Sequence, residues 1–276
     1  MLCSKEEQKN YFLWGTSMQI VGGYAVILLS LVATSQLETH VSFDHWLNRP
    51  YTKSMALKDF ENLLVPTDAT LGVEHEENLS VQNSALTFHM PKDKVWIEGS
   101  GAQIVMPIIA QQEMTLEYSV YFDGKGSPYG WTSGGKLPGV AGGKGYTGGS
   151  PAGAGDGFSA RLMFGEGGQL FAYVYHVDMK GKYGDNLGIV AYNILRQNEW
   201  NQIRIKYRIN TGSDYNGRME VWANGEYVGE KNYMRFCTNG CRIDKFLLVS
   251  FHGGQTPDYR PTKDQDIKFK WFHFSP

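Results

Sequence analysis

Strict alternation of polar and apolar residues is the feature that most limits how this chain can fold. The clearest case is the segment 200–209, WNQIRIKYRI, in which every second residue from Ile203 to Ile209 is apolar and the residues between them are polar. Side chains of a β-strand point alternately to the two faces of its sheet. Such strands predict sheets with one dry face and one wet face, as two antiparallel sheets packed face to face require.

Segments with strand-like patterns fill the chain from about Leu79 onward, whereas long amphipathic helical patterns are scarce. Asn224-Gly225 adds a strong signal for a tight hairpin turn. The prediction is an all-β fold, a jelly-roll β-sandwich with two antiparallel sheets over residues 79–276. Residues 38–78 are predicted to form an N-terminal extension with one short helix at 55–64, MALKDFENLL.

The first 37 residues have the pattern of a leader. No charged residue occurs between Lys9 and Glu38, and residues 20–33, IVGGYAVILLSLVA, form an apolar core. This core fits the apolar region of a signal peptide better than the roughly 20 apolar residues of a spanning helix. Ala33 and Ser35 are spaced for cleavage, so we expect a secreted protein. An uncleaved anchor is the alternative, and a membrane contact is expected only in that case.

A glycine-rich hairpin signal lies between 157–164 and 170–176. If Gly165 pairs with Gln169, counting outward places Arg161 opposite Tyr173 and Ser159 opposite Tyr175. Residues two apart on a strand lie roughly 6.5 Å apart, and directly opposed pairs about 5 Å at Cβ. The four side chains then form one polar patch, and a loop one residue longer or shorter would separate them.

The segment 124–157 is long, rich in glycine and without periodicity, which is typical of a functional or mobile loop. Lys136 lies within it, next to Pro138. From composition alone, Lys136 reads as a flexible surface lysine. A position from which it closes over a groove is the alternative.

The patch suits the removal of a proton next to the carboxylate of a uronic acid residue. The forked donors of Arg161 match that carboxylate. Tyr173 and Tyr175 are candidates for proton transfer, and Lys136 for a second cation or, when desolvated, for the base. Ser159 would hold a sugar or carboxylate oxygen. Taken singly, each of these residue types more often packs against its neighbours or lies on a solvated face. Only the group of them predicts a site.

Other chemistries find less support. A glycosidase needs two carboxylates flanking the scissile bond, and Glu117 is the one carboxylate that we place on the groove side. A net charge of −2 and the lack of a basic run give no reason to expect nucleic acid binding. Cys237 and Cys241 do not complete a metal motif. A disulfide between them and two free thiols are both compatible with their spacing.

The chain also resembles polysaccharide lyase family 14, which includes alginate lyases of molluscs and glucuronic-acid-cleaving lyases of viruses that infect green algae. The resemblance runs from about Ala85 to the C-terminus. It rests on the order and spacing of these motifs: SGAQIVMP, GGKLPGVAGG, DGFSARLMF, YVYH, NTGSDYNGRMEVWANGEYV, LLVSFHGGQ and PTKDQD.

The resemblance implies a concanavalin A-like jelly roll with a substrate groove on its concave sheet. The family's catalytic positions match Lys136, Ser159, Arg161, Tyr173 and Tyr175. The implied reaction is β-elimination of a polyuronate, without a metal or other cofactor. The expected partner is an acidic polysaccharide, the expected state is a monomer, and a virion-associated location would follow from a viral origin.

Three further residues are candidates for substrate contacts, namely Glu117, Gln103 in GAQ and His252 in FHGG. For Gln103 and His252, a hydrogen bond that supports a loop is an equally good interpretation. His252 stands where related sequences often have another aromatic residue. A non-catalytic module that grips acidic sugars through the same patch is the competing hypothesis for the whole protein.

Overall fold

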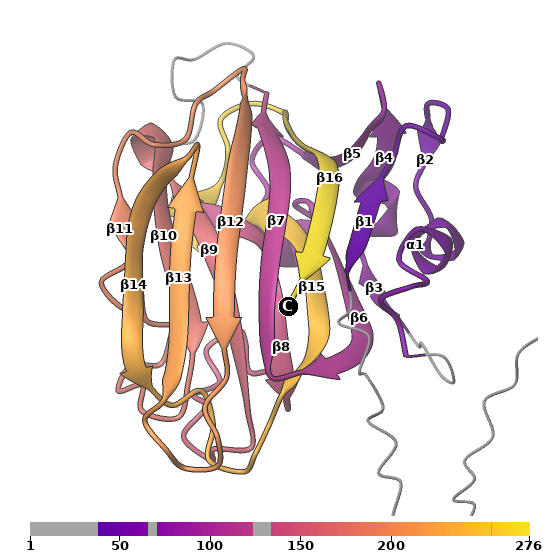
Figure 1. Cartoon of the computed structure of the whole chain (residues 1–276). Coiled ribbons are helices and arrows are strands. Elements are labelled where there is room, and N and C mark those ends of the chain that lie inside the picture. Colours follow the sequence, from indigo (N-terminus) through magenta and orange to yellow (C-terminus); the bar gives the residue numbers. More distant parts are fainter. Residues whose placement is uncertain (1–37, 66–70, 124–133, 255) are drawn as a thin grey trace, which may run out of the picture. The chain divides into compact units, whose positions relative to one another are not determined.

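Two antiparallel sheets make up the protein, as described by a computed structural model that covers residues 38–65, 71–123, 134–254 and 256–276 (Figure 1). The nine-stranded sheet has the order β14-β13-β12-β7-β16-β5-β4-β2, with β1 also paired to β16. Its strands are β1 (Thr39–Ser42), β2 (Arg49–Pro50), β4 (Leu79–Gln82), β5 (Ala85–Met90), β7 (Glu113–Phe122), β12 (Trp200–Arg208), β13 (Gly217–Ala223), β14 (Glu226–Met234) and β16 (Gln265–Ser275).

The seven-stranded sheet has the order β11-β10-β9-β8-β15-β6-β3. Its strands are β3 (Gly72–Glu74), β6 (Ala102–Gln111), β8 (Gly135–Gly143), β9 (Gly157–Gly165), β10 (Gln169–Tyr175), β11 (Val190–Ala191) and β15 (Ile243–His252). One α-helix, α1 (Lys53–Asp59), and four 3₁₀ turns complete the described residues: η1 (Glu76–Asn78), η2 (Trp96–Glu98), η3 (Glu166–Gly168) and η4 (Pro257–Tyr259).

The core lies between the two sheets. Aromatic rings from opposite sheets meet there, for example Phe122 of β7 and Phe164 of β9, whose centroids are 5.5 Å apart. On β12, Ile203, Ile205 and Tyr207 are buried while their neighbours in sequence face outward, as the alternation predicts. The predicted all-β sandwich is confirmed.

The segment 38–78 contributes to both sheets. Its strand β1 pairs with β16, β2 pairs with β4, and β3 pairs with β6 of the other sheet. The helix predicted at 55–64 is present as α1, which ends at Asp59. Within the described ranges, no helix is both long enough and apolar enough to cross a membrane. The predicted leader lies outside the described residues.

The interpretation of 124–157 as one long loop is wrong for 135–143, which form β8 in the middle of the seven-stranded sheet. The alternation of polar and apolar residues does not reveal this strand, because its glycines place no side chain on either face. Glycine also permits a close approach, since a Cβ at Gly139 would lie 2.6 Å from the Cα of Arg161 and would contact the carbonyl oxygen of Ala160. β8 is therefore a strand that packs tightly against the strand of Arg161.

We expect Gly139→Ala to lower the free energy of unfolding by about 2 kcal/mol, because the new methyl group must displace the backbone of β9. Gly153→Ala is the matched control, since a Cβ there meets nothing within 4 Å. Chemical denaturation of both variants measures the difference. Equal stability of the two variants would contradict the tight packing of β8.

Two further sequence features take a definite form. Cys237 and Cys241 form a disulfide across the short turn between them. Asn224 and Gly225 both have positive φ and connect β13 to β14, as predicted for a tight hairpin. The disulfide thus resolves the alternative that the spacing of the two cysteines leaves open.

Candidate active site

The hairpin formed by β9 and β10 has the register that loop parity predicts. Gly165 pairs with Gln169, Arg161 with Tyr173, and Ser159 with Tyr175. The turn is the 3₁₀ segment η3, in which Gly167 and Gly168 both have positive φ. The residues that alternate with the patch, such as Ala160 and Val174, belong to the core. The patch therefore lies on the face of the seven-stranded sheet that points away from the core, here called the site face.

Lys136 belongs to the same patch. It pairs with Met163 of β9 on one side and with Phe251 of β15 on the other. Its Nζ lies 2.8 Å from the Sδ of Met163 and 3.3 Å from the centroid of the Tyr173 ring. Only 7% of Lys136 is exposed. Lys136 is thus a buried strand residue beside Tyr173, and neither a surface lysine nor part of a loop that closes from above.

Two buried basic groups lie together without a counter-charge. Arg161 is almost fully buried, and neither it nor Lys136 makes an ion pair with a carboxylate in the part of the chain that the structure describes. Burial, and then the charge of Arg161, hold the pKa of Lys136 well below its usual range. Burial also lowers the pKa of Arg161. An unpaired buried cation is costly, so this arrangement favours an incoming anion.

The tyrosines form a hydrogen-bonded pair. Their hydroxyl oxygens are 3.3 Å apart, and the backbone N–H of Gly149 donates to the hydroxyl of Tyr175 at 3.0 Å. Tyr175 is fully buried, whereas Tyr173 keeps part of its surface exposed. Burial and the interaction with Tyr175 raise the pKa of Tyr173 well above its usual value. Tyr173 is therefore the protonated hydroxyl that a ligand on the site face meets first.

Ser159 lies in the patch, but its hydroxyl is hydrogen-bonded to another part of the protein. It is fully buried, and its hydroxyl donates to the carbonyl oxygen of Tyr146 at 2.6 Å. Tyr146 in turn donates to Asp156. Ser159 therefore fixes the loop between β8 and β9, which corrects the expectation that it holds a substrate oxygen.

Gln103 shares the site face, on the side of the patch where Lys136 lies. On β6 the neighbouring Ala102 and Ile104 face the core, so Gln103 faces the other way. Its amide donates to Glu74 of β3 at 3.2 Å. In the sheet order, β15 alone separates β6 from β8, the strand of Lys136. Gln103 pairs with Val249 of β15, two residues before Phe251, which pairs with Lys136. Gln103 thus lies one strand beyond the Lys136 side of the patch.

Glu117 lies on the wrong sheet for the role that its sequence suggests. It is on β7 of the nine-stranded sheet, and its side chain faces outward to Arg204 at 3.4 Å and His273 at 3.1 Å. The alternation of β7 correctly puts Glu117 on a wet face. Each sheet has such a face, however, and alternation does not tell which sheet a strand joins. The groove-side placement of Glu117 is wrong.

His252 is on the core side of β15. It is almost fully buried, its ring lies 5.5 Å from that of Phe164, and its Nε2 is 2.8 Å from the Oε1 of Gln265. Its neighbour Phe251 packs instead with Leu247 and Val249 on the site face. A substrate contact for His252 is therefore wrong, and its hydrogen bond supports the end of β15.

Two residues of the site, Met163 and Gly149, are not among those predicted from the sequence. Met163 is two residues after Arg161, so the same strand parity places it on the site face, where it contacts Lys136. Gly149 is in a glycine-rich segment with no signal for a contact with Tyr175. Among the described residues, no group of three His, Cys, Asp or Glu side chains is arranged to hold a metal ion. The assembled groups can bind an anion and transfer a proton beside it.

Comparison with known proteins places this geometry in a family. A family model described as Polysaccharide lyase 14 matches residues 78–272. The chain has no match among curated proteins.

Several solved structures have the same fold. Alginate lyase Aly36B shares 22% identity over 87% of this chain and 97% of its own, with a TM-score of 0.76. The marine PL-14 alginate lyase from Aplysia kurodai shares 22% over 88% and 100%, with a TM-score of 0.67. Alginate lyase vAL-1 from Chlorella virus shares 21% over 75% and 92%, with a TM-score of 0.63. The resemblance seen in the sequence is confirmed, and since the family match spans well over half of its residues, this chain belongs to polysaccharide lyase family 14.

Proposed function

We propose that this polysaccharide lyase acts on a polyuronate, with alginate as the first substrate to test, and cleaves it by β-elimination. The observation that carries the proposal is the burial of Lys136 and Arg161 beside Tyr173, with no carboxylate paired to either base in the described part of the chain. A uronate carboxylate supplies the missing charge. The same contact places the sugar against groups that can exchange protons.

The similar structures support the choice of substrate. Variants of the Aly36B lyase were solved in complex with an alginate tetrasaccharide and an alginate trisaccharide. The Aplysia kurodai and Chlorella virus proteins are also described as alginate lyases. A polymer of alginate type offers one carboxylate per sugar, which matches a site built around the buried guanidinium of Arg161.

The proposed mechanism assigns one task to each group. Arg161 holds the carboxylate and stabilises the negative charge that develops on it. Lys136, whose pKa is lowered by burial, takes the C5 proton as a neutral amine. The electrons of the C5–H bond form the C4–C5 double bond as the C4–O4 bond breaks. Tyr173, whose pKa is raised, gives its proton to O4.

The activity test is an incubation of the protein with alginate and with glucuronan, followed by ultraviolet absorbance of the unsaturated uronate. We expect a rise in absorbance on at least one polymer and none with Lys136→Ala. Reducing ends without the chromophore would indicate hydrolysis. Binding without any product would favour the non-catalytic module.

Arg161→Ala is expected to reduce kcat/KM by about 10²-fold, because it removes the group that holds the carboxylate in both the ground state and the transition state. A raised KM and a lowered kcat should appear together. Steady-state kinetics on the preferred polymer measure both values. Arg49→Ala, an exposed arginine on β2 at the edge of the other sheet, is the control for loss of an arginine. An unchanged KM in Arg161→Ala would argue against carboxylate binding at this position.

A further inference from the structure

The outer face of the nine-stranded sheet carries aromatic side chains that the core does not use. Trp200 of β12 and Tyr227 of β14 are 38% and 52% exposed. Trp200 lies 5.3 Å from Tyr121 of β7, and Tyr227 lies 5.3 Å from Trp222 of β13, measured between ring centroids. None of these four rings packs against a core cluster of the described residues. Two exposed rings, each packed on a partly exposed one on the same face, mark a contact surface.

Four cations lie over these rings. Arg204 and Lys206 lie 5.3 Å and 5.9 Å from the centroid of Trp222. Lys268 lies 5.9 Å from the centroid of Tyr121, and Lys270 lies 6.0 Å from that of Trp200. Together these eight residues are called the outer patch: Tyr121, Trp200, Trp222, Tyr227, Arg204, Lys206, Lys268 and Lys270.

The outer patch has an excess of positive charge. Arg204 pairs with Glu117 at 3.4 Å, and Lys268 pairs with Asp123 at 3.9 Å. Lys206 and Lys270 make no ion pair with any residue that the structure describes. Two cations of the patch are therefore open to an anionic ligand.

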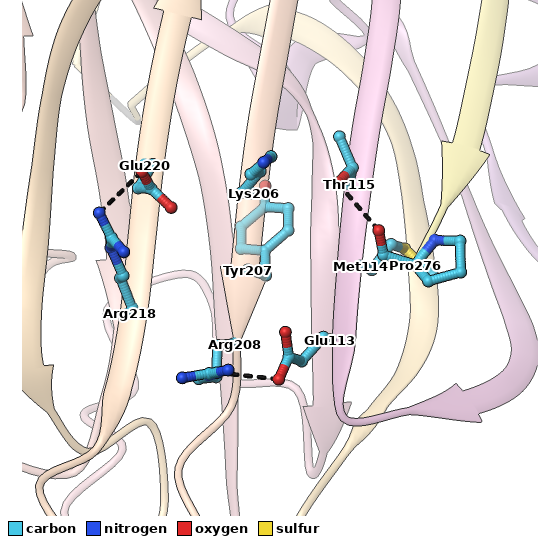
Figure 2. A pocket seen from close by; sticks show the side chains of 9 residues that line it. All are labelled: Glu113, Met114, Thr115, Lys206, Tyr207, Arg208, Arg218, Glu220 and Pro276. Atoms are coloured by element: carbon cyan, nitrogen blue, oxygen red, sulfur yellow. Dashed lines mark hydrogen bonds and ion pairs between the residues drawn. The ribbon is translucent and has the colours of Figure 1, made fainter. Parts of the chain in front are cut away.

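Lys206 borders a pocket of about 210 Å³ on this face (Figure 2). The other charged side chains of the pocket have partners of opposite charge. Arg208 pairs with Glu113 at 2.8 Å, and Arg218 pairs with Glu220 at 2.9 Å and with Glu230 of β14, which does not line the pocket. Lys206 lies on β12, between β7 and β13. It is the charged side chain of the pocket that makes no ion pair with a residue that the structure describes. A carboxylate of a polymer chain lying across the patch would contact Lys206 there.

We infer that the outer patch is a second binding surface for an acidic polysaccharide, separate from the site face. The inference rests on the proposed function, because it takes its ligand from the same class. Sugar rings stack their C–H faces on aromatic rings, while the cations meet the uronate carboxylates. Trp200 and Arg204 are four residues apart on β12, about 13 Å, so the patch spans several sugars. The surface holds the polymer near the enzyme while the site face cleaves it.

The test separates binding on the outer patch from binding at the site. In the inactive background Lys136→Ala/Arg161→Ala, retardation in an alginate-containing native gel should persist. Adding Trp200→Ala/Trp222→Ala should weaken it by about tenfold. Lys206→Gln/Lys270→Gln tests the same surface without removing a ring, in case the tryptophan variant does not fold. Tyr215→Ala is the matched control, because its ring also lies under an arginine, Arg235, but outside the patch.

In the active protein, Trp200→Ala/Trp222→Ala should lower the rate on long alginate about tenfold and leave the rate on short oligosaccharides unchanged. Retardation equal to that of Tyr215→Ala in both patch variants would overturn the inference. So would a dimer in the wild type that either patch variant dissolves, since the occupant would then be a second copy of the chain. Absence of any lyase product in the wild type would instead overturn the proposed function.

Discussion

Lys136→Met is expected to reduce kcat by about 10³-fold and at the same time to raise the free energy of unfolding by about 1 kcal/mol or more. The activity falls because the amine that takes the C5 proton is lost. The stability rises because methionine fills a similar volume beside Met163 without a buried basic group. Steady-state kinetics and chemical denaturation at neutral pH measure the two effects.

The stability of the wild type should also depend on pH in a defined direction. The pKa of Lys136 is lower in the folded protein than its unfolded value of 10.5. Between the two values the unfolded chain binds more protons, so the free energy of unfolding rises with pH. The free energy cost of burying the protonated amine of Lys136 applies in full when the pH is below the pKa of Lys136 in the folded protein. This cost vanishes when the pH is above 10.5. Lys136→Met should lack this part of the pH dependence, and its advantage in stability should shrink as the pH rises.

Two controls make the prediction specific to the buried amine. Lys144→Met changes an exposed lysine one residue beyond β8 and should leave stability and activity nearly unchanged. Lys136→Arg keeps a cation that does not release its proton. High activity in Lys136→Arg would show that charge alone is needed and would exclude Lys136 as the base. A wild type as stable as Lys136→Met at neutral pH would contradict an unpaired buried charge.

The parts of the site that the sequence predicts are those that strand parity controls. Once Gly165 pairs with Gln169, the positions of Arg161 and Tyr173 follow from the period of two alone. The alternation of polar and apolar residues in β12 likewise predicts which of its side chains are buried. The family resemblance then added the reaction class, which no pattern of polarity contains.

The errors have physical causes of three kinds. The strand of Lys136 is rich in glycine, so it lacks the side-chain pattern that reveals a strand. Glu117 follows the alternation correctly, but its sheet depends on long-range pairing of β7 with β12 and β16. His252 lies in a strand that is buried on both faces, where polarity does not distinguish one face from the other. Each of these features is decided by tertiary packing.

Tyr173→Phe is expected to reduce kcat by about 10³-fold with little change in KM, because it removes the proton donor to O4 but leaves the ring beneath Lys136. Tyr175→Phe should reduce kcat by about 10²-fold or less, also with little change in KM. Its hydroxyl is buried behind Tyr173 and acts on the substrate only through the 3.3 Å contact between the two hydroxyls. Kinetics of both variants on one polymer measure the ratio of the two losses.

The double variant Tyr173→Phe/Tyr175→Phe distinguishes a relay from two independent roles. If Tyr175 acts through Tyr173, the double variant should be no slower than Tyr173→Phe alone, because residues of one unit are not additive. Tyr146→Phe is the matched control, since it removes a hydroxyl that bonds to Asp156 and not to the pair. A larger loss in Tyr175→Phe than in Tyr173→Phe would reverse the assignment. The buried tyrosine would then be the group that exchanges the proton, and the loop at Gly149 would have to open for the substrate to reach it.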